Sequence, residues 1–118
     1  MTFSFFIGGY FSINRQVTYK AGSLHCNEYE SLPQTGNCKV LPVANNPAWQ
    51  ELLRFLQACA WQKNYHDLEV LDGTQWELTF TQPGKKLICS GSNQYPSDFE
   101  QFLQLLQNVT APIGFTIW

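Results

Sequence analysis

The stretch from residue 68 to 107 constrains the fold most, because its turns and hydrophobic spacing can be read directly. Asp72-Gly73 is a typical two-residue turn, since glycine tolerates the positive φ that a tight hairpin requires. Over residues 75–81 apolar and polar side chains alternate, which predicts a strand with one buried face, formed by Trp76, Leu78 and Phe80. We therefore expect residues 68–71 and 75–81 to form the central hairpin.

A second turn and a helix follow this strand. Pro83-Gly84 predicts a turn that returns the chain as an antiparallel strand over residues 86–90. Ser97 is a favourable helix N-cap, and Glu100, three residues later, completes a capping box. The sequence predicts a helix whose apolar stripe covers the strand. The stripe consists of Phe99, Phe102, Leu103 and Leu106. The polar side, which faces away, consists of Asp98, Gln101, Gln104 and Gln107.

The N-terminal residues have the composition of strands. Residues 2–13 are rich in Phe and Ile, and Gly8-Gly9 indicates a kink or bulge within that strand. A turn at residues 14–15 and alternation over residues 16–21 predict a hairpin partner, and residues 24–29 predict a third strand. Several strands therefore precede the first helix.

A connection and a helix link the two groups of strands. Residues 30–46 contain prolines, a glycine and asparagines, which predicts an irregular segment in which Val40-Leu41 contacts the core or adds an edge strand. Asn46-Pro47 predicts a helix start, with Asn as the cap and Pro in the first helical position. We expect this helix to end near Gln62. Its apolar stripe consists of Trp49, Leu52, Leu53, Leu56 and Ala60.

Two further segments complete the predicted domain. Residues 63–67 indicate a polar link, and residues 115–118 indicate either a final short strand or an apolar tail over the core. The order of elements predicts one α+β domain over residues 1–118, with an antiparallel sheet of about four to six strands covered by two helices.

Composition and charge exclude several classes of protein. The chain has 118 residues, 14% of them charged, and a net charge of −2, without the basic stripe of a nucleic-acid binder. No apolar run is long enough for a membrane span, and no charged region precedes residues 2–11 as in a signal peptide. We therefore expect a cytoplasmic protein with reduced thiols. Cys59 and Cys89 are expected to be buried, and Cys26 and Cys38 could pair only after export.

Catalytic and metal-binding constellations are weak in this sequence. His25 and His66 could form an acid/base pair with Lys85 or Lys86 as a phosphate ligand, but no spacing supports this. A zinc site from the histidines with Cys26 and Cys38 lacks the usual paired spacing of ligands. We predict no catalytic residue, no metal and no cofactor.

Two other groups of residues are candidates for binding. The loop residues Gly91, Ser92, Asn93 and Tyr95 precede a helix, so they could hold an anion at its N-terminus; the alternative is that they shape the loop. Aromatic and acidic residues that suit a protein interface gather over residues 61–77. They are Trp61, Tyr65, Asp67, Glu69, Asp72 and Glu77. The alternative is that Trp61 closes the core and the acids are solvated.

The patterns W-x-x-x-Y (Trp61, Tyr65), D-G-x-x-W-x-L (from Asp72), G-S-N-x-Y-P (from Gly91) and F-x-x-F (from Phe99) together span a large part of the chain. This combination resembles a pattern in small, mostly uncharacterised bacterial proteins, over about residues 49–106. In overall character the chain is also similar to the immunity proteins of bacterial toxin systems, including contact-dependent growth inhibition. That likeness implies a small, non-enzymatic cytoplasmic protein that binds a basic toxin domain.

Three hypotheses follow from the sequence. The leading one is a protein-binding module, most concretely an immunity protein that covers the active site of a basic, nuclease-type toxin through residues 61–77. The second is a small enzyme or ligand-binding protein that uses the loop at residues 91–96 with His25 or His66. The third is a subunit that dimerises through its N-terminal strand or residues 115–118, although we expect a monomer.

Overall fold

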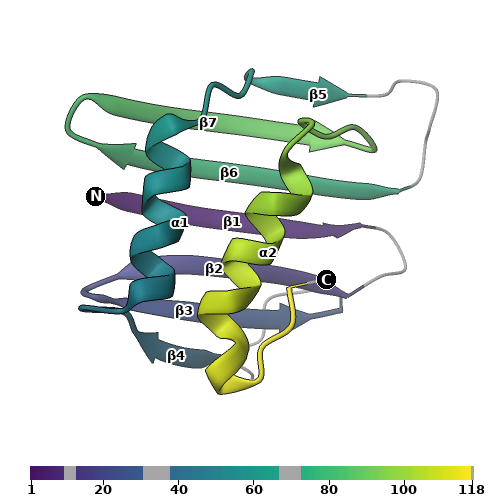
Figure 1. The fold of residues 1–118 in the computed structure, drawn as a ribbon. Coiled ribbons are helices and arrows are strands. Elements are labelled where there is room, and N and C mark those ends of the chain that lie inside the picture. Colours follow the sequence, from purple (N-terminus) through teal and green to yellow (C-terminus); the bar gives the residue numbers. More distant parts are fainter. Residues whose placement is uncertain (10–12, 31–37, 67–72, 118) are drawn as a thin grey trace.

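The protein folds as a single α+β domain in which two helices lie on one face of a seven-stranded sheet (Figure 1). The computed structural model describes residues 1–9, 13–30, 38–66 and 73–117. The strands are β1 (Thr2–Gly9), β2 (Asn14–Lys20), β3 (Ser23–Tyr29), β4 (Lys39–Pro42), β5 (Asn64–His66), β6 (Thr74–Gln82) and β7 (Lys85–Ser92). The helices are α1 (Pro47–Ala58) and α2 (Phe99–Thr110), which is followed by the 3₁₀ turn η2 (Ala111–Ile113). The α+β prediction is confirmed.

The sheet has the strand order β4-β3-β2-β1-β6-β7-β5 and is antiparallel except where β5 pairs with β7. β6 is an inner strand that lies between β1 and β7; Leu78, for example, is opposite Phe5 on one side and Cys89 on the other. The predicted hairpin between residues 68–71 and β6 is therefore wrong, because both edges of β6 are already paired. Residues 68–71 themselves lie outside the described residues.

The covered face of the sheet and the inner sides of the helices form one aromatic core. Trp76, Leu78 and Phe80 are fully buried, as their alternation predicts, and so is the stripe of α2. Trp49 of α1 packs edge-on against Phe3 of β1, with ring centroids 5.4 Å apart. Period-2 and period-3.6 patterns therefore locate the core correctly.

The start of α1 is confirmed and its end is not. The Asn46 side chain accepts a hydrogen bond from the Trp49 N–H at 3.0 Å, and Pro47 is the first helical residue. The helix ends at Ala58, short of Gln62, because the next residue, Cys59, adopts an extended conformation. Cys59 is buried while Ala60 is exposed, which reverses the predicted stripe at this end.

The predicted capping box of α2 is also wrong. The N-cap is Asp98, not Ser97, and its side chain does not cap the helix. Instead, the Asp98 carboxylate accepts a hydrogen bond from the indole Nε1–H of Trp61 at 2.7 Å. At the other end, α2 continues beyond residue 107, and Gln107 bonds the C-terminal segment rather than facing away.

Several weaker predictions about strands are resolved as well. Asn14 and Arg15 belong to β2 rather than to a turn, and residues 64–66 of the predicted polar link form the edge strand β5. Residues 8–9 end β1, while β4 confirms the predicted edge strand around Val40. In the C-terminal segment, Phe115 and Ile117 are buried without forming a strand; Trp118 lies outside the described residues.

In the described part of the chain, no helix covers the opposite face of the sheet (Figure 1). This face carries polar and charged side chains, such as Glu77 and Lys86, and a few apolar ones, of which Val40 and Ile88 are about half exposed. All four cysteines are free thiols, and Cys38 is the exposed one. No helix in the described part of the chain has the length and apolar character needed to cross a membrane.

Candidate functional site

The loop between β7 and α2 is locked to the start of β6 by its asparagine. The Asn93 side chain accepts a hydrogen bond from the Thr74 N–H at 3.0 Å, and the Asn93 N–H donates to the Thr74 carbonyl at 2.9 Å. Asn93 has a φ of 59°, a left-handed conformation that Asn tolerates better than most residues. At Gly73, a Cβ would lie 1.7 Å from Asn93 Oδ1, so only glycine fits beside this side chain.

A second contact ties the same loop to Trp76. The indole Nε1–H of Trp76 donates to the Gln94 carbonyl at 3.0 Å, and a Cβ on Gly91 would lie 2.2 Å from that nitrogen. Ser92 is the last residue of β7, opposite Gln75. We call Gly73, Trp76, Gly91, Asn93 and Gln94 the junction; its polar groups hold the fold together, which supports the shape-forming interpretation of the loop.

Trp61 and Tyr65, predicted as partner-binding residues, are half-buried against the core. The Trp61 ring packs edge-on against Trp76 with centroids 5.7 Å apart, and the Tyr65 ring lies 5.8 Å from Trp76. The Tyr65 hydroxyl accepts a hydrogen bond from the Gln62 N–H at 2.8 Å. Glu77 is exposed on the open face of β6. The other three predicted residues, Asp67, Glu69 and Asp72, lie outside the described residues.

The two histidines are far apart. His25 is on β3 and His66 on β5, so five strand spacings separate them, or about 24 Å. They cannot act together on one group of a substrate. Among the residues that the structure describes, no cluster of three or more His, Cys, Asp or Glu could hold a metal ion.

The buried cysteines are poor nucleophiles at neutral pH. Burial raises the pKa of the Cys26 thiol to about 12, with a further contribution from the nearby Cys38. Burial likewise raises the pKa of Cys59 to about 11 and also raises that of Cys89. Since the thiolate is the reactive form, these three side chains behave as small apolar core residues.

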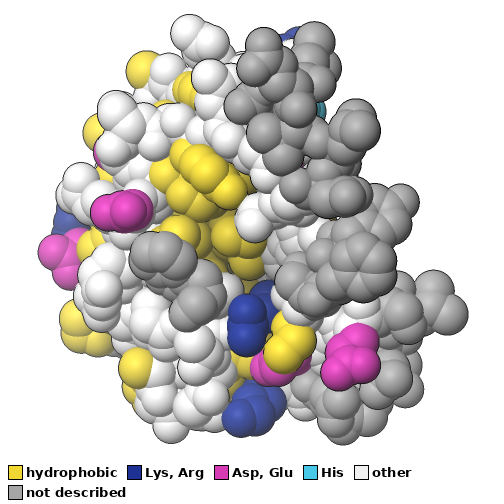
Figure 2. Space-filling model, turned by 90° about the vertical axis from the view of Figure 1, so that its right-hand side faces the viewer, with side chains coloured by type: hydrophobic (Ala, Val, Ile, Leu, Met, Phe, Trp, Pro, Cys, Tyr) yellow, Lys and Arg dark blue, Asp and Glu magenta, His cyan; other side chains and the backbone are white. Residues whose placement is uncertain are grey.

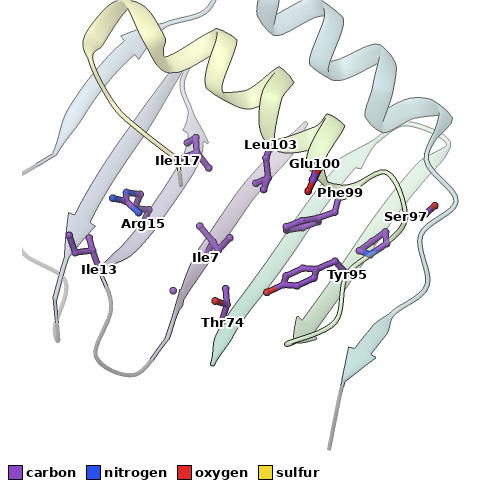
Figure 3. A pocket seen from close by; sticks show the side chains of 12 residues that line it. Ile7, Ile13, Arg15, Thr74, Tyr95, Ser97, Phe99, Glu100, Leu103 and Ile117 are labelled. Atoms are coloured by element: carbon purple, nitrogen blue, oxygen red, sulfur yellow. The ribbon is translucent and has the colours of Figure 1, made fainter. Parts of the chain in front are cut away.

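A pocket of about 460 Å³ opens where β1 ends and β6 begins, below the first turns of α2. Figure 2 shows this end of the molecule, with a patch of hydrophobic side chains and basic side chains below it. Figure 3 shows the described residues that line the pocket. They are Ile7, Gly8, Ile13, Arg15, Thr74, Tyr95, Pro96, Ser97, Phe99, Glu100, Leu103 and Ile117.

The apolar walls of the pocket are held in place from behind. The Phe99 ring packs between Trp76 and Tyr95, with centroids 4.9 Å and 5.0 Å away. Ile117 is fully buried, and its N–H donates to Gln107 Oε1 at 2.8 Å. The same Gln107 donates through Nε2 to the Phe115 carbonyl at 3.0 Å, which fixes the C-terminal segment along α2.

Two charged side chains line the pocket on different elements. Arg15 comes from β2, and in Figure 3 it lies across Ile7 and Leu103 from Glu100 of α2. In the described part of the chain, the Nε–H of Arg15 is buried without a hydrogen-bond acceptor. Sequence reasoning placed Arg15 in a turn and missed it; its two-residue spacing from Val17 puts it on the covered face.

A second hollow, of about 650 Å³, lies along β7 next to the start of the short strand β5. It brings together Trp61 and Glu77, two of the predicted partner-binding residues. The other charged residues that line it are Lys63 and Lys86. The described part of this surface is therefore of mixed charge rather than acidic.

The loop singled out by the sequence reaches the first pocket only with its second half, through Tyr95 and Pro96. Neither histidine lines either hollow. Comparisons of the chain with protein-family models, with curated proteins and with solved structures find no match. The geometry of the two hollows therefore carries the functional argument.

Proposed function

We propose that the protein is a non-enzymatic binding protein that holds a small, largely apolar ligand in the pocket between β1, β6 and α2. The observation that carries this proposal is the pocket itself. Its volume of about 460 Å³ falls in the range of small-molecule sites. Its walls are mainly apolar, with a few polar groups that could orient a ligand, as in such sites generally.

The walls favour a site that exists before the ligand arrives. Ile117 and Phe99 are fixed by hydrogen bonds and ring contacts that do not involve the pocket. Tyr95, 40% exposed, is a side chain of the rim that a ligand can cover. A preformed apolar site gains affinity because little conformational entropy is lost on binding.

The test uses the neutral probe 4-phenylbutan-1-ol and methyl-detected NMR of the whole protein. We expect saturable shifts at the methyl groups of Ile7, Leu103 and Ile117, which line the pocket. The methyls of Val40 and Ile88, exposed on the open face, are internal controls and should not move. Equal shifts at all five residues, or none at the first three, would refute the proposal.

A matched pair of variants locates the binding. Ser97 is exposed and lines the pocket, so Ser97→Trp should fill the mouth and abolish saturable shifts. Gln101 is exposed in the first turn of α2, close to Ser97 in sequence, and is not a lining residue, so Gln101→Trp should bind the probe like the wild type. Binding that survives Ser97→Trp would place the probe elsewhere.

The second hollow favours a second candidate function, the binding of a protein. We propose, as this alternative, a cytoplasmic inhibitor of the immunity-protein kind whose partner is a basic toxin domain. Trp61 and Glu77 line the hollow, and residues 64–84 contain four acidic residues and no Lys or Arg. Because Lys63 and Lys86 also line it, the attraction must come mainly from Asp67, Glu69 and Asp72.

This alternative is tested with a partner that co-purifies from the source cells in stoichiometric amount and is then reconstituted from pure components. Replacing Asp67, Glu69 and Asp72 with Ala should slow association several-fold and flatten its dependence on salt. Replacing Glu28, Glu30 and Glu51, which are acids outside residues 64–84, with Ala is the control. Equal effects of the two triple variants would reflect net charge rather than this surface.

A further inference from the structure

The pocket is electrically polarised, and this limits the ligands that suit it. Among the described lining residues, the only side chain with a permanent positive charge is Arg15, and the only carboxylate is Glu100. The side chains between them in Figure 3, Ile7 and Leu103, are apolar. Resting on the proposed function, we propose that the ligand is a short apolar zwitterion of about dipeptide size, with its carboxylate at Arg15 and its ammonium group at Glu100.

Arg15 supplies the stronger half of the argument. Its neighbours on the covered face at two-residue spacing, Val17 and Tyr19, pack into the core, so the guanidinium projects on the side of the helices. Its Nε–H is buried without an acceptor among the described residues, so no hydrogen bond to this nitrogen competes with a ligand for the guanidinium. A guanidinium binds a carboxylate with two parallel hydrogen bonds, which selects a planar anion.

Glu100 supplies the other half. Glu100 is the residue after Phe99 on α2. Because the Phe99 ring contacts Trp76 of β6 and Phe5 of β1, this turn of α2 is fixed against the sheet, with Glu100 on the α2 side of the pocket. It is exposed, and the described residues give it no basic partner in the pocket other than Arg15. A ligand that carried only negative charge would be attracted by Arg15 and repelled by Glu100.

The spacing of the elements sets the length of the ligand. β1 separates β2, which carries Arg15, from β6, which contributes Thr74 to the pocket. Two strand spacings are about 10 Å, and an extended peptide advances about 3.3 Å per residue. An extended segment of two or three residues therefore spans the pocket across the sheet, with its side chains against apolar lining residues such as Ile7.

The experiment compares four forms of one dipeptide by calorimetry and by the same methyl signals. L-leucyl-L-leucine has both charges, its N-acetyl form only the carboxylate, its amide only the ammonium, and N-acetyl-leucyl-leucinamide neither. A charge-assisted hydrogen bond in a half-open site should contribute about tenfold in affinity. We expect the zwitterion to bind about tenfold tighter than either singly blocked form.

Two variants assign the charges. In Arg15→Gln, a dipeptide with a free carboxylate should no longer bind more tightly than its amide. A dipeptide with a free ammonium group should still bind more tightly than its acetylated form. Glu100→Gln should show the reverse pattern. Unfolding midpoints of both variants check that they fold. Equal affinities of the four forms would refute the proposal of a zwitterionic ligand. It would also be refuted if the zwitterion still bound most tightly after both substitutions.

The outcomes separate this inference from the function on which it rests. If 4-phenylbutan-1-ol and the neutral dipeptide shift the pocket methyl signals and the charged forms bind no more tightly, the proposal of an apolar site holds. The proposal of a zwitterionic ligand is then wrong. If no dipeptide and no neutral probe shifts these methyls, both proposals fail together.

Discussion

Residues 91–97, which run from the end of β7 towards α2, divide into two halves with opposite roles. In residues 91–94 the polar groups bond β6, and Gly91 leaves space for the Trp76 indole. In residues 95–97 the side chains line a pocket, and Tyr95 is 40% exposed. The polar groups of the first half stabilise the fold, while the side chains of the second half line the pocket. The junction should therefore tolerate little change, and the pocket much more.

The largest expected effect is at Gly91. In Gly91→Ala the new Cβ would lie 2.2 Å from Trp76 Nε1 and 2.7 Å from the Gln94 carbonyl oxygen. Relief requires a shift of the indole or the loop, so we expect a loss of about 3 kcal/mol or more in the free energy of unfolding, measured with urea. Gly84→Ala is the control: its φ is 80° with nothing within 4 Å, so backbone strain alone should cost about 1 kcal/mol. Similar losses in both would remove the steric argument.

Asn93→Ala should be the next most costly substitution. It leaves the Thr74 N–H without its side-chain acceptor and places Ala at a φ of 59°, which together predict a loss of about 2 kcal/mol. Asn93→Gly removes the same hydrogen bond without the backbone strain, so it should cost about 1 kcal/mol less than Ala. Equal losses in the two urea titrations would mean that the left-handed conformation contributes nothing.

The buried thiols beneath the helices should make the stability of the fold depend on pH in the alkaline range. Because the Cys26 pKa is raised from 9.0 to about 12, the folded protein keeps a proton that the unfolded chain loses above pH 9. This contribution to stability is complete below pH 9 and is lost as the pH rises toward 12. Between pH 8 and pH 10 the wild type should lose about 1 kcal/mol more than Cys26→Ala.

The control for this titration is Val109→Ala, which truncates a buried side chain and removes no thiol. It should therefore have the pH dependence of the wild type. A Cys26→Ala protein that loses stability as steeply as the wild type would show that Cys26 is accessible to solvent.

The smallest expected change in stability is at Arg15. Arg15→Met keeps the approximate length of the side chain and removes a guanidinium whose Nε–H is buried and has no acceptor among the residues that the structure describes. The free energy of unfolding should change by no more than about 0.5 kcal/mol, because no described ion pair or hydrogen bond is lost. A loss as large as that of Asn93→Ala would make Arg15 part of the fold rather than of a site.

Local patterns predicted the core well, because a two-residue or 3.6-residue period depends only on nearby residues. Trp76, Leu78 and Phe80 are buried as expected. The pairing of β6 with β1 could not be predicted in this way, since Phe5 and Leu78 are distant in sequence. The turn at Asp72-Gly73 suggested the nearest strand as the partner instead.

The candidate site was only partly visible in the sequence for the same reason. Tyr95 drew attention through its loop, but Arg15 and Ile117 meet near it only through the order of the strands and the fold of the tail. The cap of α2 was mispredicted for a related reason. The carboxylate of Asp98, the N-cap residue, accepts a hydrogen bond from Trp61, which is distant in sequence, and does not cap the helix. Contacts between remote residues override the local signal at these positions.

The junction also bears on how proteins of this shape could diverge. Gly73, Trp76, Gly91 and Asn93, which belong to the sequence pattern, are occupied with one another. Arg15 lies outside that pattern, and Glu100 occupies one of its unspecified positions. A chain that kept these four residues and changed Arg15 and Glu100 would retain the junction and alter the two charges that line the pocket. The scaffold and the charges of the pocket can therefore vary independently in sequence.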